Sequence, residues 1–185
     1  MPVDPSTLIV VHYPAAILRA RASDVPSITD EVREVASRMI DLMRQEEGIG
    51  LAAPQVGLSW RMFVVEIPED DSRSASAEPM SATKGPVVYI NPVLSEAGGP
   101  LESKEEGCLS LPDIRGPIQR PALITVRARG LDGIEFTQRA GGLLARCLQH
   151  ENDHLDGSLI IDKMPQIHRL KNRSAIRALE REATQ

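Results

Sequence analysis

The feature that most constrains this chain is the run His150-Glu151-Asn152-Asp153-His154, in which two histidines lie four residues apart. On a helix, with about 3.6 residues per turn and about 1.5 Å rise per residue, these positions share a face, about 6 Å apart along the axis. Their imidazole rings can then bind one ion at about 2.0–2.1 Å. Glu151 would lie beside that ion, close enough to take a proton from water. On a helix, this pattern is a signature of metal-dependent hydrolases.

The residues around this motif have the spacing of a helix with one buried face. Side chains of that face recur with a period of about 3.6 residues at Leu143, Leu144, Cys147, Leu148, Glu151, His154 and Leu155. Gly157 follows, and glycine ends many helices because it adopts the left-handed conformation easily. The pattern therefore predicts a helix that carries both histidines and ends near Gly157.

Two imidazoles do not complete a metal site, so a third ligand is required. Cys147 lies one turn before His150, but it is seven residues from His154, or about 10.5 Å along a helix. An ion with bonds of about 2.0–2.3 Å cannot span that distance. The third ligand must come from elsewhere, and the chain offers Cys108 in the run Glu106-Gly107-Cys108-Leu109-Ser110.

Composition limits the class of protein. A chain of 185 residues with 42% hydrophobic content can bury the core of a single domain, and its net charge of -5 argues against bulk nucleic-acid binding. Two cysteines without a short spacing indicate a reducing compartment. The first 13 residues carry an aspartate and no Lys or Arg, and no apolar run approaches the ~20 residues of a membrane span. We therefore expect a cytoplasmic protein with no membrane partner.

The remaining pattern predicts an α+β fold, a compact single domain over 1–185 with largely antiparallel sheets around the central metal-binding helix. A helix is expected from Ser27 to Glu47, with Ser27 as its cap and Gly48 as its stop. Strands are expected over 61–67, 87–94, 122–129 and 134–138, and the turn Gly98-Gly99-Pro100 is expected to end the second. The aperiodic segment 68–86 is expected to be a surface loop.

The loop 48–57 combines small residues with one amide. Gly48 and Gly50 are spaced as in a phosphate-binding loop, but the lysine and the strand context of such loops are absent. Small residues in a row instead mark backbone that approaches a ligand or a neighbouring segment closely. Gln55 would then place its amide in a tight apolar loop.

The segment 163–185 is a basic tail, expected to be helical. Six Lys or Arg side chains face only two acidic ones there, at Lys163, Arg169, Lys171, Arg173, Arg177, Arg181, Glu180 and Glu182. Two interpretations stay open, a solvated helix face or docking on an acidic partner such as ribosomal RNA.

Taken together, three stretches of the chain resemble peptide deformylase. That family carries a GxGxAAxQ loop, an EGCxS strand end and an HExDH helix in this order, here Gly48–Gln55, Glu106–Ser110 and His150–His154. The resemblance extends from about Leu8 to Asp162. It implies a compact α+β domain that hydrolyses the N-formyl group of formylmethionine on nascent peptides and releases formate.

The resemblance also implies roles for individual residues. Cys108, His150 and His154 would hold one divalent ion with water in the fourth place, iron(II) in the cell, with zinc, nickel or cobalt possible in purified protein. Glu151 would move protons, and the Gln55 amide and the Leu109 N–H would stabilise charge on the formyl oxygen. Substrate contacts are expected from Ile49, Gly50, Gly107, Arg115, Leu143, Arg146 and Cys147.

Within this last set the implied contacts differ. Ile49, Leu143 and Cys147 would line the methionine pocket, and Arg115 would contact the peptide backbone. Arg146 stands where some family members have an aliphatic residue lining the pocket, which leaves the shape of the pocket open.

Other functions remain as alternatives. A zinc metallopeptidase also uses HExxH but takes a downstream third ligand, and the later candidates Asp162 and His168 lack the usual spacing. A non-catalytic relative that only binds the ribosome predicts loss of Glu151, Gln55 or a ligand, and all of these are present. A purely structural metal site normally has four protein ligands and no poised carboxylate.

Overall fold

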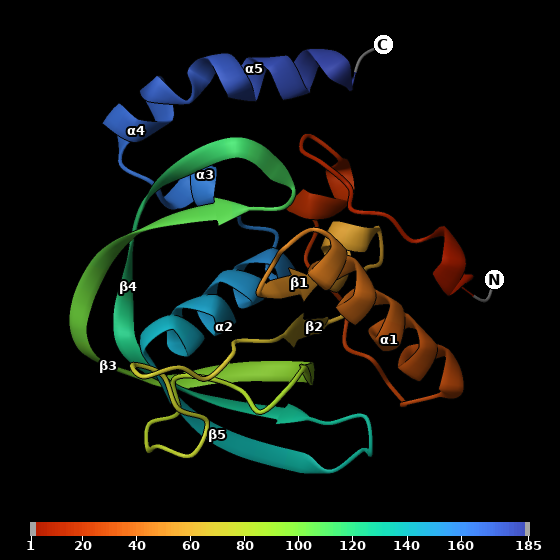
Figure 1. Cartoon of the computed structure of the whole chain (residues 1–185). Coiled ribbons are helices and arrows are strands. Elements are labelled where there is room, and N and C mark those ends of the chain that lie inside the picture. Colours follow the sequence, from red (N-terminus) through yellow and green to blue (C-terminus); the bar gives the residue numbers. More distant parts are fainter. Residues whose placement is uncertain (1–2, 184–185) are drawn as a thin grey trace.

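The computed structural model describes residues 3–183, and helix α2 (Gly142–Leu155) lies at its centre. Figure 1 shows α2 inside the hollow of a strongly bent sheet, with α1 on one side and the C-terminal helices outside. The five strands are antiparallel throughout and follow the order β1-β2-β3-β4-β5. This arrangement confirms the predicted α+β fold around a central helix.

The bounds of the elements are as follows. The strands are β1 Gly50–Ala52, β2 Met62–Val65, β3 Val87–Cys108, β4 Leu111–Arg129 and β5 Glu135–Gly141. The other α-helices are α1 Asp30–Gln45, α3 Ile160–Lys163, α4 Gln166–Lys171 and α5 Arg173–Glu182. Short 3-10 turns occur at Pro5–Thr7, Ala16–Arg19 and Ala53–Val56.

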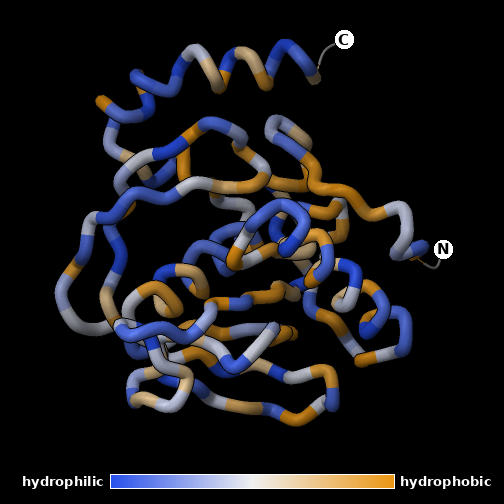
Figure 2. The backbone as a smooth tube through the Cα atoms, in the orientation of Figure 1, coloured by the Kyte–Doolittle hydropathy of each residue, from blue (hydrophilic) through white to orange (hydrophobic). Residues whose placement is uncertain are grey.

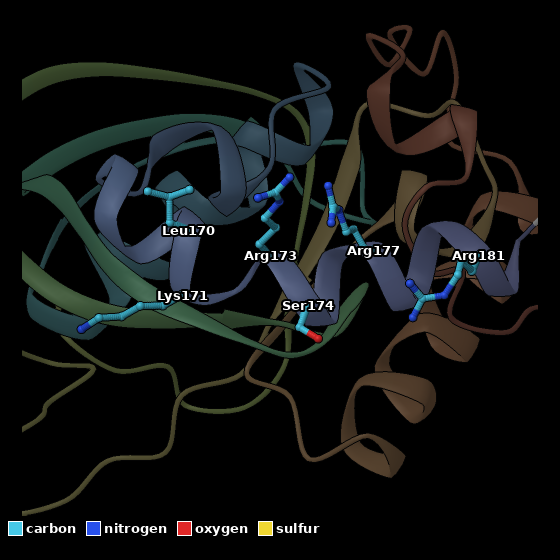
Figure 3. Close-up of a pocket in the computed structure, with 6 residues that line it drawn as sticks. All are labelled: Leu170, Lys171, Arg173, Ser174, Arg177 and Arg181. Carbon is cyan, nitrogen blue, oxygen red and sulfur yellow. The ribbon is translucent and has the colours of Figure 1, made fainter.

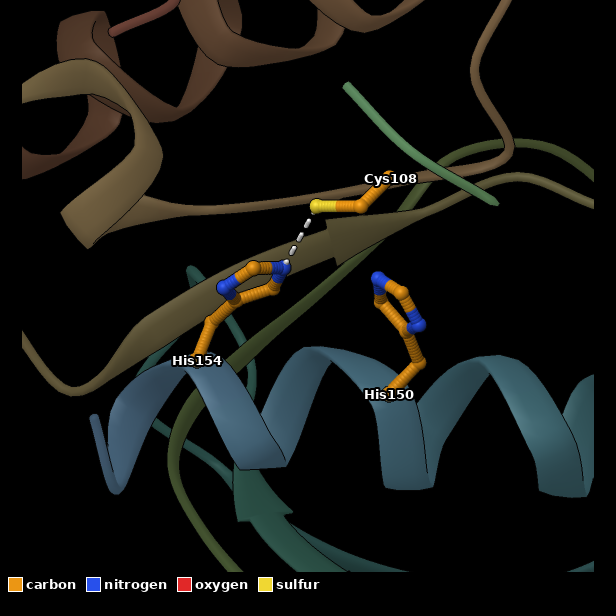
Figure 4. Close-up of side chains that lie close together, drawn as sticks. All are labelled: Cys108, His150 and His154. Carbon is orange, nitrogen blue, oxygen red and sulfur yellow. Dashed lines mark hydrogen bonds between the residues drawn. The ribbon is translucent and has the colours of Figure 1, made fainter. Parts of the chain in front are cut away.

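Strands β3 and β4 form a long bent hairpin of 22 and 19 residues. The prediction that a turn at Gly98-Gly99-Pro100 ends the strand was therefore wrong. The pairing shifts register on both sides of Gly98, and Gly99 has φ +71, which glycine adopts without strain. These glycines form a bulge that bends β3 while the strand continues. As a result β3 runs on to Cys108 at the hairpin tip, which reaches the inner face of α2 (Figure 4).

Helix α1 is shorter than the predicted 27–47, and Ser27 is not its cap. Thr29 caps it, because its Oγ1 accepts a hydrogen bond from the N–H of Val32 at 3.4 Å. Val32 is also the first residue of the buried face, so the cap lies directly before the apolar spacing begins. The expected apolar face is confirmed, with Val32, Val35, Met39, Leu42 and Met43 all buried.

Three apolar clusters hold these elements together. The first joins α2 to the sheet and contains Phe63 and Tyr89, whose ring centroids lie 5.0 Å apart. The second packs α1 against β1 and β2, and the third lies between the start of β4, α3 and the inner side of α5. Helix α2 is therefore fixed from several directions, which suits an element that must place functional side chains accurately.

The outer segments attach to this core at a few points. The segment 68–86 is mostly exposed, yet Ala75, Ala82 and Thr83 are buried. In Figure 2 the short strand β2 is hydrophobic, whereas α5 is mainly hydrophilic. No helix within residues 3–183 is both long and apolar enough to cross a membrane.

Candidate metal centre and active site

Two histidines of α2 and one cysteine of β3 converge at the hairpin tip. Figure 4 shows the rings of His150 and His154 rising from one face of α2 toward Cys108. The ligand atoms of these three residues all lie within 4.8 Å of one another, and Cys108 Sγ lies 3.2 Å from His154 Nε2. The two rings are 5.1 Å apart between centroids. Among the residues that the structure describes, these three side chains form the group whose ligand atoms lie close enough together to hold one metal ion.

The donor set fits a divalent transition metal. Two imidazoles and one thiolate suit iron, zinc, nickel or cobalt. Burial lowers the pKa of His154, so its ring is neutral and can act as a ligand. His150 Nδ1 donates to Glu106 Oε2 at 2.9 Å, which leaves Nε2 of that ring as the atom available to an ion.

The second cysteine, Cys147, lies in a different environment. Its Sγ donates to the carbonyl of Ile49 at 3.6 Å, and burial raises the pKa of this thiol well above its usual value. A protonated thiol is a poor ligand, which agrees with the argument from helix geometry that Cys147 is not a ligand. Ile49 is 38% exposed beside it, and the half-buried Leu143 lies one turn earlier on α2.

Glu151 is a buried carboxylate next to the ligands. It is 4% exposed, and its Oε2 has no hydrogen-bond partner among residues 3–183. Burial raises its pKa to about 7, above the ordinary range of a carboxyl group. The strand β1 passes so close that a Cβ on Gly50 would lie 2.4 Å from Glu151 Oε1. Gly50 is therefore the residue that makes room for this carboxylate.

The amide of Gln55 is held in one orientation at the same site. Its Oε1 accepts from the N–H of Ala52 at 2.8 Å, which fixes the side chain within its own loop. Its Nε2 then donates to Ser110 Oγ at 3.3 Å and faces Cys108 Sγ at 3.6 Å. Leu109 lies in the turn between β3 and β4, directly after Cys108. Both predicted oxyanion donors thus lie next to the cysteine, Gln55 in space and Leu109 along the chain.

Gly107 and Arg115 lie opposite each other at the end of the hairpin. They are paired in the β3–β4 register, and a Cβ on Gly107 would lie 3.3 Å from the guanidinium of Arg115. Arg115 is exposed, and its carbonyl accepts a hydrogen bond from Asn172 Nδ2 at 2.8 Å. The Arg115 side chain is accessible at the strand edge nearest Cys108.

Residues that the sequence did not single out form a charged network beneath the ligands. Glu106 is 7% exposed and accepts from Arg120 at 2.6 and 2.8 Å, and Arg120 also donates to Asp153 at 2.9 Å. Burial alone would raise the pKa of Glu106, but the hydrogen bonds from Arg120 and His150 outweigh it and lower that pKa to about 2. The sequence signal that could have revealed this network is that Glu106 lies inside the EGCxS motif and Asp153 inside the HExDH motif.

Arg146 belongs to this network. Its guanidinium donates to Glu106 Oε1 at 2.6 Å and to the carbonyls of Ile118 and Glu102 at 2.9 and 2.7 Å. The charged end of the side chain is thus bound by β3 and β4, and the substrate contact implied for Arg146 stays a prediction.

Comparison with known proteins identifies the family. Residues 7–170 match the family model described as polypeptide deformylase. The chain is 40% identical over 162 residues to the peptide deformylase of Desulforudis audaxviator, covering 88% of this chain and 96% of that protein. Among solved structures, the Plasmodium falciparum enzyme superposes with a TM-score of 0.83 at 34% identity over 95% of this chain and 97% of that one. The Thermotoga maritima enzyme superposes with a TM-score of 0.76 at 36% identity, over 85% of this chain and 97% of that one. The chain belongs to the polypeptide deformylase family, and it is a metal-dependent hydrolase.

Proposed function

We propose that the enzyme removes the formyl group from N-formylmethionyl nascent peptides, with Cys108, His150 and His154 holding one divalent ion and Glu151 transferring the protons. The convergence of three ligand atoms within 4.8 Å beside a buried carboxylate is the observation that carries this proposal. When bound, the ion supplies Lewis acidity at this point: it polarises the formyl carbonyl and lowers the pKa of water.

Glu151 has the surroundings that a proton-transfer group needs. One carboxylate oxygen is buried without a partner among residues 3–183, so it is available to accept the proton of the attacking water. The same group then donates that proton to the leaving amine of methionine. Such transfers typically contribute about 10²–10⁴-fold to the rate.

Gln55 and Leu109 would stabilise the negative charge that grows on the formyl oxygen. The Gln55 amide is already oriented by its bond to the N–H of Ala52, so it costs little reorganisation when the charge develops. One such donor is typically worth about 3–4 kcal/mol in the transition state. The Leu109 N–H, directly after Cys108 in the chain, would be the second donor.

The substrate would lie along the tip of the hairpin. Ile49, Leu143 and Cys147 form an apolar surface next to Glu151 that suits the methionine side chain. Gly50 and Gly107 keep the backbone of β1 and β3 uncovered beside it, and Arg115 offers a cation for the peptide carbonyls.

The direct test is turnover of formyl-Met-Ala beside acetyl-Met-Ala and an internal peptide, with metal content measured on the same sample. Release of formate by a metal-loaded chain, with little action on the other two substrates, is expected. Cleavage of the internal peptide instead would favour the metallopeptidase alternative, and metal binding without any turnover would favour a non-catalytic relative.

The proposed working ion is iron(II). A thiolate ligand makes bound iron easy to oxidise, and Cys108 itself can be oxidised to sulfenic and sulfinic acid. Iron-loaded enzyme prepared without oxygen should be the most active and should lose activity in air, whereas nickel or cobalt forms should keep theirs. Equal rates for zinc and iron, with no loss in air, would contradict this choice of ion.

The proposed partner of the tail is ribosomal RNA, which would place the enzyme in the cytoplasm beside its substrate. The apolar side chains of α5 face the core through Ala175, Ile176 and Leu179. A groove on the outer side of the tail is lined by Leu170, Lys171, Arg173, Ser174, Arg177 and Arg181, and Figure 3 shows the arginines spaced along α5. Clustered arginines bind phosphates by bidentate hydrogen bonds.

Co-sedimentation with purified ribosomes tests this partner. The wild-type chain should sediment with ribosomes at low salt and dissociate as salt rises, because phosphate contacts release counterions. The double variant Arg173→Glu with Arg177→Glu should bind more weakly at every salt concentration while formyl-Met-Ala turnover is unchanged. Equal binding of both proteins would favour the solvated-face interpretation.

A further inference from the structure

Arg146 links the metal-binding helix to both long strands. It is 7% exposed, and its guanidinium donates to Glu106 of β3 at 2.6 Å, to the Glu102 carbonyl at 2.7 Å and to the Ile118 carbonyl of β4 at 2.9 Å. A planar guanidinium can satisfy such divergent acceptors at once, which a lysine ammonium on a flexible stem does less well. The side chain therefore fixes where α2 lies against the hairpin.

The spacing on α2 sends Arg146 and His150 to the same carboxylate. Residues four apart share a helix face, so both side chains reach Glu106 from one side. Arg146 takes Oε1 and His150 Nδ1 takes Oε2 at 2.9 Å, while Arg120 contacts both oxygens. Glu106 is thereby held by three donors, and neither of its oxygens can rotate away from its partner.

The charged groups of this network are paired with opposite charges. Arg120 contacts both Glu106 and Asp153, Arg146 contacts Glu106, and the more exposed Lys163 contacts Asp153. A buried carboxylate needs such partners to remain ionised. An ionised Glu106 is an acceptor only, so the bonded nitrogen of His150 must carry the hydrogen.

We infer that Arg146 is a positioning residue of the metal centre, which holds Glu106 so that Glu106 directs His150 Nε2 toward the ligand atoms of Cys108 and His154. Partners of this kind, which orient a ligand histidine, typically change metal affinity by about 10–100-fold when they are removed. Because Arg120 would still hold Glu106, we expect loss of Arg146 to weaken metal binding by about 10-fold, at the lower end of that range.

The inference rests on the proposed metal site but not on the formyl substrate, so its test measures the metal directly. The full-length chain is loaded with cobalt(II), and the visible absorption bands and the dissociation constant of cobalt are recorded. The variants are Arg146→Met, which removes the charge and all three bonds, and Arg146→Lys, which keeps a charge that can reach Glu106. The unfolding midpoint in urea is measured for each protein.

A matched control is Arg61, which lies outside α2 and contacts the C-terminal end of that helix. Arg61 donates to Asp156 at 2.9 Å and to Asn152 at 3.3 Å, and within residues 3–183 it makes no hydrogen bond or ion pair with Glu106 or a metal ligand. Arg61→Met should lower stability in the same manner as Arg146→Met, yet leave the cobalt bands unchanged. A general loosening of α2 is thereby separated from a specific effect on His150.

The expected result is a shift of the cobalt bands and about 10-fold weaker cobalt binding in Arg146→Met, with partial recovery in Arg146→Lys. If Arg146→Met does not fold, a folded Arg146→Lys that binds cobalt a few-fold more weakly supports the inference. Bands and affinity equal to wild type in a folded Arg146→Met, or in a folded Arg146→Lys if Arg146→Met does not fold, would overturn it. Altered KM and side-chain preference with an unchanged cobalt site would instead assign Arg146 to the methionine pocket, and a wild-type chain that binds no cobalt would overturn the metal site as well.

Discussion

Replacing Gly50 with alanine should disable the enzyme by displacing Glu151. The added Cβ would lie 2.4 Å from Glu151 Oε1 and 2.8 Å from Cys147 Sγ, whereas ordinary contacts begin at 3.4 Å. The carboxylate and β1 must therefore separate by about 1 Å. Misplacement of a reacting group by about 1 Å can cost 10²-fold in rate, which equals about 2.7 kcal/mol of activation free energy.

The substitution should leave the chain folded while it lowers turnover. Overfilling a packed interior by one methyl group typically costs about 1–3 kcal/mol of unfolding free energy. The assay is steady-state hydrolysis of formyl-Met-Ala, with bound metal and the urea midpoint measured on the same preparation. We expect kcat to fall by about 10²-fold while the metal content stays near that of the wild type.

Gly85→Ala is the control, because nothing lies within 4 Å of a Cβ at that position. It should leave kcat, KM and the urea midpoint unchanged. A metal-loaded Gly50→Ala protein with kcat within a few-fold of wild type would refute the argument, since Glu151 would then tolerate a displacement that general acid–base transfer does not allow.

Four further substitutions follow from the site and the fold. Glu151→Ala should keep the fold and the metal but lower kcat by about 10²–10⁴-fold, and near-normal turnover in a metal-loaded sample would contradict its role in proton transfer. Cys147→Ser should keep full metal stoichiometry and mainly raise KM, whereas Cys108→Ala should lose the metal; elemental analysis showing the reverse would reassign the third ligand. Gly157→Ala should lower the free energy of unfolding by about 1–3 kcal/mol, because Gly157 has φ +72 and its Cβ would lie 2.5 Å from the carbonyl oxygen of Arg19. Its kcat at low temperature should stay near wild type, so a large loss of kcat with an unchanged melting temperature would contradict a purely structural role.

The sequence predicted the metal-binding helix well because its signals are local. The spacing of apolar residues, the i and i+4 histidines and the stop at Gly157 all lie within about five turns of one helix. The exclusion of Cys147 as a ligand likewise needed only helix geometry, and its buried, protonated thiol agrees with it.

The bent hairpin could not be predicted in the same way. Gly98 and Gly99 mark either a chain reversal or a bulge, and the choice depends on whether distant residues of β4 remain paired beyond them. The buried network around Glu106 was missed for a similar reason, since its members are 14 to 47 residues apart in pairs such as Glu106 with Arg120 and Glu106 with Asp153. Polar side chains in a strand pattern look exposed until tertiary structure buries them.

The central position of α2 has a consequence for how the enzyme loses activity. Helix α2 packs against the sheet through the first apolar cluster, and it supplies the histidines and the carboxylate from the same turns. A site on a surface loop can open locally while the rest of a protein stays folded, but a site on such a buried helix opens only with the whole cooperative unit. Thermal inactivation and global melting should therefore coincide in this enzyme, and the amide hydrogens of α2 should exchange with solvent as slowly as any in the chain.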